Sequence, residues 1–242
     1  MRTMYRLACG IVATSLAVLA NLSYARAATL AEWLFAGAST TGAKAPSTVI
    51  ADTSVSTLNR PTPSRLDDGT FFSSFHSYAQ NGGTTDTLTS AITQASYAGF
   101  TITPSAGFTL NLTDLSTWVR AQNDPKTFAL MSSLTGFAPT DTVLATSVAD
   151  GNAGVRQTAD LTSPVFQGVT TPVEFRWYIF HPSGSGDFQA RGFGNWDNNA
   201  ANNMILTGTV ASAAVVPETG TVTLALGGLA LLGGVVLPRR AR

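Results

Sequence analysis

Four side chains that could recognise a ligand alternate with apolar ones along residues 173–181. Successive side chains of a strand point to opposite faces, so one face would carry Glu174, Arg176, Tyr178 and Phe180. Aromatic rings can stack on the apolar faces of sugar rings, while charged groups bind sugar hydroxyls. The pattern predicts a sugar-binding face or, more simply, a surface ion pair between Glu174 and Arg176. The opposite face, expected in the core, carries Val173, Phe175, Trp177 and Ile179.

Two further segments are predicted to extend this ligand face by the same alternation. They contribute Trp118, Arg120, Gln189, Arg191 and Phe193. A second interpretation is that a long segment, such as 59–97, covers the face, so that its aromatic rings belong to an ordinary core. The position of that segment relative to the sheet distinguishes the two interpretations.

Residues suited to catalysis are sparse. His76 and His181 show no metal-ligand spacing, and the chain has no Gly-x-Ser-x-Gly motif. Glu32 and Glu174 are the only glutamates before the C-terminal tail. Glycosidic cleavage usually needs two carboxylates at a defined separation, so a carbohydrate-active enzyme is kept as an alternative. We expect no cofactor, with a loop calcium site as the alternative. The candidate calcium ligands are Asp187, Asp197, Asn198 and Asn199.

The charge balance argues against one class of partner. Of the 14 Lys and Arg residues, three lie in the first 27 positions and three at the C-terminal end, whereas one of 14 acids, Glu218, lies in a terminal segment. The body of the chain is therefore mildly acidic. Without a basic face it is not expected to bind nucleic acid. The single cysteine, Cys9, lies near the N-terminus, so the body can form no disulfide of its own.

The elements that must position these side chains are expected to be β-strands. The body is rich in Thr, Ser, Gly, Asn and aromatic residues, and turn signals recur about every ten residues. We predict an all-β fold, a β-sandwich with jelly-roll connections, with a helical turn at 87–95 and a bulge near Asp114. The predicted strands are 30–35, 49–56, 70–75, 99–103, 108–120, 127–133, 143–149, 156–161, 173–181, 188–193 and 204–210.

The N-terminal segment is typical of a secretory signal peptide. Two arginines precede a largely apolar run, 7–22, and an Ala-Arg-Ala sequence follows it. Small residues at these positions are what a signal peptidase requires, so we expect residues 1–27 to be removed on export. The residues that define the cleavage site are Ala25, Ala27 and Ala28.

The C-terminal segment is typical of a membrane-spanning tail. Its uncharged run, 221–237, would span about 25 Å as a helix, close to a hydrocarbon core of roughly 30 Å. Arginines follow this run, and under the positive-inside rule they stay cytoplasmic while the preceding domain lies outside. These arginines are Arg239, Arg240 and Arg242.

The order of parts in this tail resembles a known sorting signal. A Val-Pro-Glu start, a run rich in Leu and Gly at 224–232 and terminal arginines are similar to the PEP-CTERM signal, which exosortases recognise in Gram-negative bacteria that make exopolysaccharide. That signal usually has a second proline where this chain has Thr219. The segment therefore also resembles a variant of the LPxTG signal of Gram-positive sortases, and an uncut membrane anchor is a third interpretation. The signal residues are Val216, Pro217, Glu218, Thr219 and Gly220.

The body resembles a group of uncharacterised PEP-CTERM proteins with a predicted jelly-roll domain. The resemblance implies the fold over most of residues 30–210 but no reaction. The last strand of that group often begins with Asp-Asn, whereas this chain has Asn202-Asn203, which weakens the case for a metal site. The similar segments are strand and turn patterns at 31–35, 97–116, 128–137, 173–178 and 203–208.

Together these features predict a signal peptide at 1–27, a β-sandwich domain at 28–210, a linker at 211–215 and a sorting tail at 216–242. We expect a transient stay in the inner membrane, with a signal peptidase and an exosortase-type enzyme as processing partners. The favoured function is a non-catalytic structural or adhesive role at the cell surface or in the extracellular matrix, with exopolysaccharide as a ligand. A carbohydrate-active enzyme and a wall-anchored sortase substrate are the alternatives.

Overall fold

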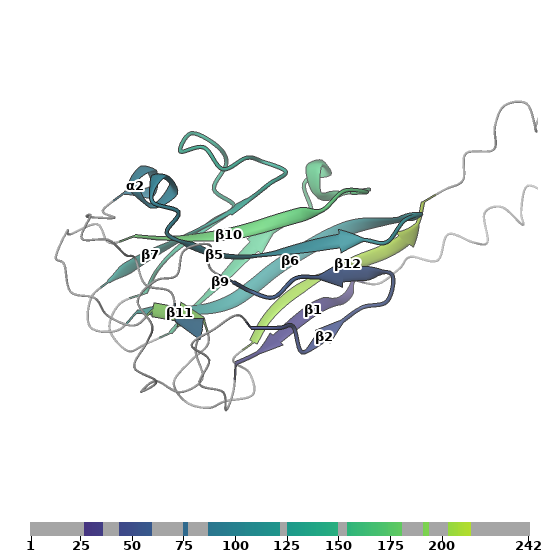
Figure 1. The fold of residues 1–242 in the computed structure, drawn as a ribbon, viewed down its shortest axis with the longest axis horizontal. Helices are drawn as coiled ribbons and strands as arrows, with labels where there is room; N and C mark the ends of the chain where they lie inside the picture. The colour runs from purple at the N-terminus through teal and green to yellow at the C-terminus, as the bar shows by residue number, and fades with distance from the viewer. Residues whose placement is uncertain are drawn as a thin grey trace, which may run out of the picture. The chain divides into compact units, whose positions relative to one another are not determined.

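Two antiparallel β-sheets form the fold, as the prediction of an all-β sandwich requires (Figure 1). Their inward faces share one hydrophobic core, so each sheet buries one side against the other. The computed structural model describes residues 27–35, 44–59, 75–76, 87–121, 125–149, 154–180, 191–193 and 203–213.

The first sheet has seven strands, in the order β2-β1-β12-β6-β11-β4, with β9 paired to β6 outside this path. The long strand β6 is its centre, because it pairs with β9 over residues 114–119 and with β11 over residues 119–121. The strands are β1 (Ala28–Leu34), β2 (Thr48–Val49), β4 (Phe75–His76), β6 (Phe108–Ala121), β9 (Val155–Asp160), β11 (Arg191–Phe193) and β12 (Asn203–Ser212).

The second sheet has five strands, in the order β3-β5-β10-β7-β8. Its central strand, β10, places Glu174 opposite Thr101 and Arg176 opposite Gly99 on β5. A short helix, α2 (Leu88–Thr93), packs on this sheet and is capped by Thr87 and Ser90 in a capping box. The strands are β3 (Thr53–Val55), β5 (Tyr97–Pro104), β7 (Lys126–Ser132), β8 (Ala145–Ala149) and β10 (Val173–Phe180). A 3₁₀ turn spans Pro164–Phe166.

One strand prediction is wrong. Residues 49–56 do not form a single strand, since a turn at Ala51 and Asp52 separates β2 from β3. Asp52 has a φ of 61°, a left-handed conformation that Asp tolerates better than most residues. The turn carries the chain from the seven-stranded sheet into the five-stranded one, so the two halves of the predicted strand serve different sheets.

The burial pattern along β6 fits the predicted bulge near Asp114. Leu110 and Leu112 face the core in its first half, whereas Leu115 and Val119 face it in the second. The inward side thus changes from even to odd positions around Asp114, as an extra residue there would produce. The predicted helical turn at 87–95 is confirmed by α2.

The core between the sheets is aromatic at its centre. The rings of Trp33 and Phe100 lie 4.5 Å apart, and Phe100 is 5.5 Å from Phe175. A buried amide, Gln157, joins the sheets because Trp177 Nε1 donates to its Oε1 at 2.8 Å and its Nε2 donates to the Phe128 carbonyl at 2.9 Å. The inward residues of β10 are all fully buried, so their assignment to the core is confirmed.

Candidate functional site

The outward side of β10 has a covered end and an open end. Tyr178 is buried with Ala91 of α2 and Met131, and Phe180 packs against the same cluster. Glu174 and Arg176 keep 30% and 24% of their side-chain surface exposed. The interpretation that part of segment 59–97 covers this face is therefore correct for Tyr178, because α2 lies over it, but the ion pair remains accessible.

The prediction that Trp118, Arg120 and Arg191 extend this face is wrong. They lie on β6 and β11, which pair with each other in the seven-stranded sheet, whereas β10 belongs to the five-stranded sheet. Alternation along a strand shows which side chains share a face, but it does not show which sheet the strand enters. Trp118 is half-buried, and Arg120 is fully buried, which lowers the pKa of its guanidinium.

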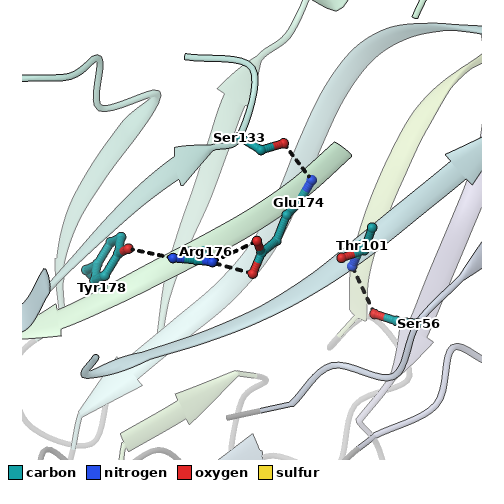
Figure 2. A network of polar contacts seen from close by, with 6 residues as sticks. All are labelled: Ser56, Thr101, Ser133, Glu174, Arg176 and Tyr178. Carbon is teal, nitrogen blue, oxygen red and sulfur yellow. Dashed lines mark hydrogen bonds and ion pairs between the residues drawn. The ribbon is translucent and has the colours of Figure 1, made fainter. Parts of the chain in front are cut away.

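Arg176 is held by an acid, a phenol and two aromatic rings. Its Nε and Nη2 donate to Oε1 and Oε2 of Glu174, both at 2.8 Å, and its Nη1 donates to Tyr178 Oη at 3.3 Å (Figure 2). The guanidinium carbon lies 4.4 Å from the ring centroid of Tyr97 and 3.9 Å from that of Phe137. Bidentate pairing and cation–π contacts both order this side chain. The predicted ion pair is thus part of a rigid cluster.

The electrostatics of this cluster keep Arg176 charged and Tyr97 neutral. Burial by itself lowers the pKa of Arg176, but hydrogen bonds with Glu174 and Tyr178 and the attraction of the Glu174 carboxylate raise it overall. Burial raises the pKa of Tyr97, and the nearby positive charge of Arg176 opposes this only in part. At neutral pH the phenol therefore keeps its proton and can donate or accept a hydrogen bond.

A surface pocket of about 250 Å³ lies beside Glu174. Its lining combines Tyr97, Gly99 and Phe100 with several residues that have polar side chains. Residues with hydroxyl, amide and carboxylate groups therefore line one small surface pocket, as expected of a site for a polar ligand. The polar side chains are those of Ser56, Thr57, Asn59, Thr101 and Glu174.

Gly99 allows a close backbone approach at the edge of this pocket. It lies between Tyr97 and Thr101, on the same side of β5. A Cβ atom at this position would lie 2.5 Å from the carbonyl oxygen of Phe175 and 3.4 Å from Cγ of Arg176. No larger residue fits there without a shift of the backbone. Such a shift would change the wall of the pocket, because Gly99 is one of its lining residues.

The wall opposite Glu174 is a bulge in the chain that follows β3. The Ser56 amide donates to the Thr101 carbonyl, and Asn59 exchanges both backbone hydrogen bonds with Gly99. One strand therefore has an extra residue relative to the other, which defines a β-bulge. The Thr101 amide donates to Ser56 Oγ at 2.9 Å (Figure 2). The bulge leaves Thr57 exposed at the pocket while Leu58 stays buried.

Sequence reasoning identified Glu174, Arg176 and Tyr178 but missed the rest of this site. Thr57 and Asn59 lie outside every predicted strand, and Phe137 had no assigned role. One signal was present, since an isolated glycine in a strand pattern indicates a bulge or a close backbone approach. Gly99 is such a glycine, and both features occur at it.

The structure gives no support to a metal centre in the part of the chain it describes. No group of three or more His, Cys, Asp or Glu residues that could hold a metal ion occurs among the described residues. The side chains of His76 and His181 lie outside the described residues. So do the calcium candidates Asp187, Asp197, Asn198 and Asn199.

Most residues of the two predicted sorting segments also lie outside the described residues. Ala25 lies outside the described residues. Ala27 precedes β1 and Ala28 begins it, and both are exposed. Among the residues with described structure, no helix is long and apolar enough to span a membrane, and the predicted span 221–237 is not among them. The same holds for the signal residues 216–220 and for the arginines 239, 240 and 242.

No protein-family model matches the chain, and no curated protein matches it either. Its functional interpretation therefore rests on the geometry of the pocket and on the sequence patterns at the two ends.

Proposed function

We propose that the β-sandwich binds carbohydrate through the pocket beside Glu174, and that the chain is an exported, non-catalytic protein of the cell surface or extracellular matrix. The observation that carries this proposal is a surface pocket of about 250 Å³ lined by Tyr97 together with residues that carry hydroxyl, amide and carboxylate groups. Pockets for drug-sized ligands have volumes of roughly 300–1,000 Å³. The smaller pocket suits one sugar unit of a polymer whose remaining units lie along the surface.

The site is suited to sugars because its groups are held in place before a ligand arrives. Arg176 lies over the ring of Tyr97 and donates hydrogen bonds to both carboxylate oxygens of Glu174. The Glu174 backbone amide donates to Ser133 Oγ at 3.0 Å (Figure 2). A site with fixed side chains loses little conformational entropy when it binds, and this matters for a ligand as small as one sugar unit.

The arrangement of carboxylates favours binding over cleavage. Glu174 is the only Asp or Glu among the residues that line the described pocket. Both of its oxygens accept hydrogen bonds from Arg176. Hydrolysis of a glycosidic bond usually uses two carboxyl groups, one of which must donate a proton. The pocket as described supports recognition without a reaction.

A binding measurement tests this proposal. The full-length chain is expressed and purified after the cell has processed it. The protein is screened against immobilised polysaccharides, and its affinity for each hit is measured by calorimetry. We expect Thr57→Val to weaken binding by about fivefold, the effect of one lost hydrogen bond of about 1 kcal/mol. Thr146→Val, at an exposed position on β8, is the matched control and should bind normally. No binding to any polysaccharide, or equal binding by both variants, would refute the proposal.

The export part of the proposal rests on the two terminal segments. The predicted signal peptide and the PEP-CTERM-like tail support passage through the inner membrane, tail processing by an exosortase-type enzyme and a jelly-roll domain outside the cell. Intact mass of the protein recovered from the surface or medium of its host tests this. We expect a species that starts near Ala28 and ends between Val216 and Gly220. A species that keeps Arg242 and stays in the membrane fraction would contradict processing and indicate a plain anchor.

A further inference from the structure

The pocket is lined by polar side chains with one negative charge and no positive charge. Its described lining contains the Glu174 carboxylate but no Lys, Arg or His. Other polar groups in the wall, such as Thr57 and Thr101, are neutral. A ligand that carries its own carboxylate or sulfate would therefore meet an anion at the pocket wall, without a cation among the lining residues to balance it.

The cation next to the pocket, Arg176, is engaged elsewhere. Its Nε and Nη2 bind Glu174, its Nη1 binds Tyr178, and the rings of Tyr97 and Phe137 pack on its guanidinium. These contacts account for three of the five N–H donors that arginine carries. An anionic ligand that used the two remaining donors would have to share the charge of Arg176 with the carboxylate of Glu174, which is already bound in the preferred bidentate geometry.

Glu174 nevertheless keeps capacity to accept hydrogen bonds. Each of its oxygens accepts one N–H from Arg176, whereas an ionised carboxylate offers about four acceptor sites in total. About one site on each oxygen is left. Because the arginine fork takes the two parallel lone pairs, the remaining two point to opposite sides of the carboxylate, and each can accept a hydrogen bond from one sugar hydroxyl.

We infer that the pocket takes a neutral sugar unit through a hydroxyl donated to Glu174, and that it rejects uronic acids and other anionic units. This inference rests on the proposed carbohydrate-binding function and adds the class of sugar. Glu174 is then a residue that determines specificity, because it supplies the acceptors and occupies the cation that an acidic sugar would need.

The test compares neutral hexose oligosaccharides with matched oligosaccharides in which C6 is oxidised to a carboxylate. Calorimetry on the full chain should give at least tenfold tighter binding of the neutral member. Glu174→Gln should weaken neutral binding at least tenfold and strengthen uronate binding, because it removes the anion and releases Arg176. Asp160→Asn makes the same change of charge on the seven-stranded sheet and should leave both affinities unchanged.

A second variant serves if Glu174→Gln does not fold, as judged by its thermal unfolding curve. Thr57→Lys places a cation at the rim on an exposed residue and should tighten uronate binding several-fold. Wild-type protein that binds uronates as well as neutral sugars would overturn the inference while leaving carbohydrate binding intact. If Glu174→Gln changed the affinities for neutral sugars and for uronates equally, the inference would also be overturned while carbohydrate binding stood. Absence of binding to either ligand would overturn the proposed function itself.

Discussion

The outward faces of the two sheets differ in how their polar side chains are paired. On the seven-stranded sheet, neighbouring strands β6 and β12 pair their polar residues directly. The hydroxyls of Thr113 and Thr207 lie 2.7 Å apart, and Asn111 Nδ2 donates to Thr209 Oγ1 at 3.4 Å. Regular pairing of the strands brings each polar group opposite another. The hydrogen-bonding capacity of this face is therefore used largely within the protein.

The five-stranded sheet interrupts this regularity at one place. Gly99 approaches the Phe175 carbonyl too closely to carry a side chain, and the bulge at 56–59 changes the register of the neighbouring segment. Thr57 and Glu174 both line the pocket at this place. The difference between the two faces indicates that a pocket can occur in a sandwich where a bulge and a glycine interrupt regular strand pairing.

The largest effect is expected from adding a side chain at Gly99. Gly99→Ala should lower the free energy of unfolding by about 1–3 kcal/mol, as overpacked sites do, because its Cβ meets the Phe175 backbone. Gly208→Ala on β12 is the matched control, since its Cβ would meet Asn111 and Leu30. Chemical denaturation should show a loss in both variants. Sugar binding at a temperature where both are folded should fall only in Gly99→Ala. A normal affinity in Gly99→Ala would show that Gly99 does not belong to the binding site.

A smaller loss of stability is expected from removing the ordered cation. Arg176→Met removes the bidentate ion pair and two ring contacts. We expect it to lower the free energy of unfolding by about 1–2 kcal/mol, less than for a fully buried pair, because this pair is partly solvated. Arg156→Met on the other sheet loses one hydrogen bond from an exposed side chain to Ser116 and should cost less than about 0.5 kcal/mol. Denaturation midpoints measure both. Equal costs would mean that the cluster adds no stability beyond that of a surface arginine.

The hydroxyl pair on the seven-stranded sheet should show coupling. Thr113→Val and Thr207→Val should each cost about 0.5–1 kcal/mol, because each removes the bond between the two hydroxyls, and Thr207 Oγ1 keeps only a longer bond to the Asp114 carbonyl at 3.3 Å. The double variant should cost less than the sum of the two, since neither hydroxyl is then left unpaired. A double-mutant cycle on unfolding free energies measures the coupling. Strict additivity would contradict direct pairing of these two residues.

The smallest effects are expected in the pH dependence of stability, with opposite signs on the two sheets. Burial raises the pKa of Tyr97 in the folded state, so its contribution is present below its ordinary value of about 10 and is lost as the pH rises through the folded pKa. Hydrogen bonds from the Thr162 hydroxyl and amide lower the pKa of Asp160. Its contribution is present above about 3.9 and is lost as the pH falls through the folded pKa.

Melting temperatures measured across the pH range test the contributions of Tyr97 and Asp160. Tyr97→Phe should flatten the alkaline loss of stability, and Asp160→Asn should flatten the acid loss. The titration of tyrosinate absorbance should show one late-ionising phenol that is absent from Tyr97→Phe. Identical pH profiles for the wild type and a variant would remove that residue as a source of the dependence.

Strand pattern and residue type predicted much of the fold but less of the site. Period-2 alternation located β10 and its core side correctly, because a buried face requires apolar residues at every second position. The same pattern placed Trp118, Arg120 and Arg191 beside Arg176, and this was wrong because strand order depends on contacts between distant parts of the chain. The split of 49–56 was missed for a related reason. The left-handed conformation of Asp52 turns the chain locally. Which sheet each half of the segment joins depends on contacts with strands far away in the sequence.

The sequence by itself determined the all-β class, the inward side of β10, the pairing of Glu174 with Arg176, and the patterns at both ends that predict export. Each of these follows from local periodicity or from residues two positions apart on one strand. Only the tertiary structure decided that Tyr97 and Phe137 enclose Arg176, and that a bulge and a glycine open a pocket beside it. These features depend on the register between strands that are far apart in the sequence, and register is fixed by packing of the whole core.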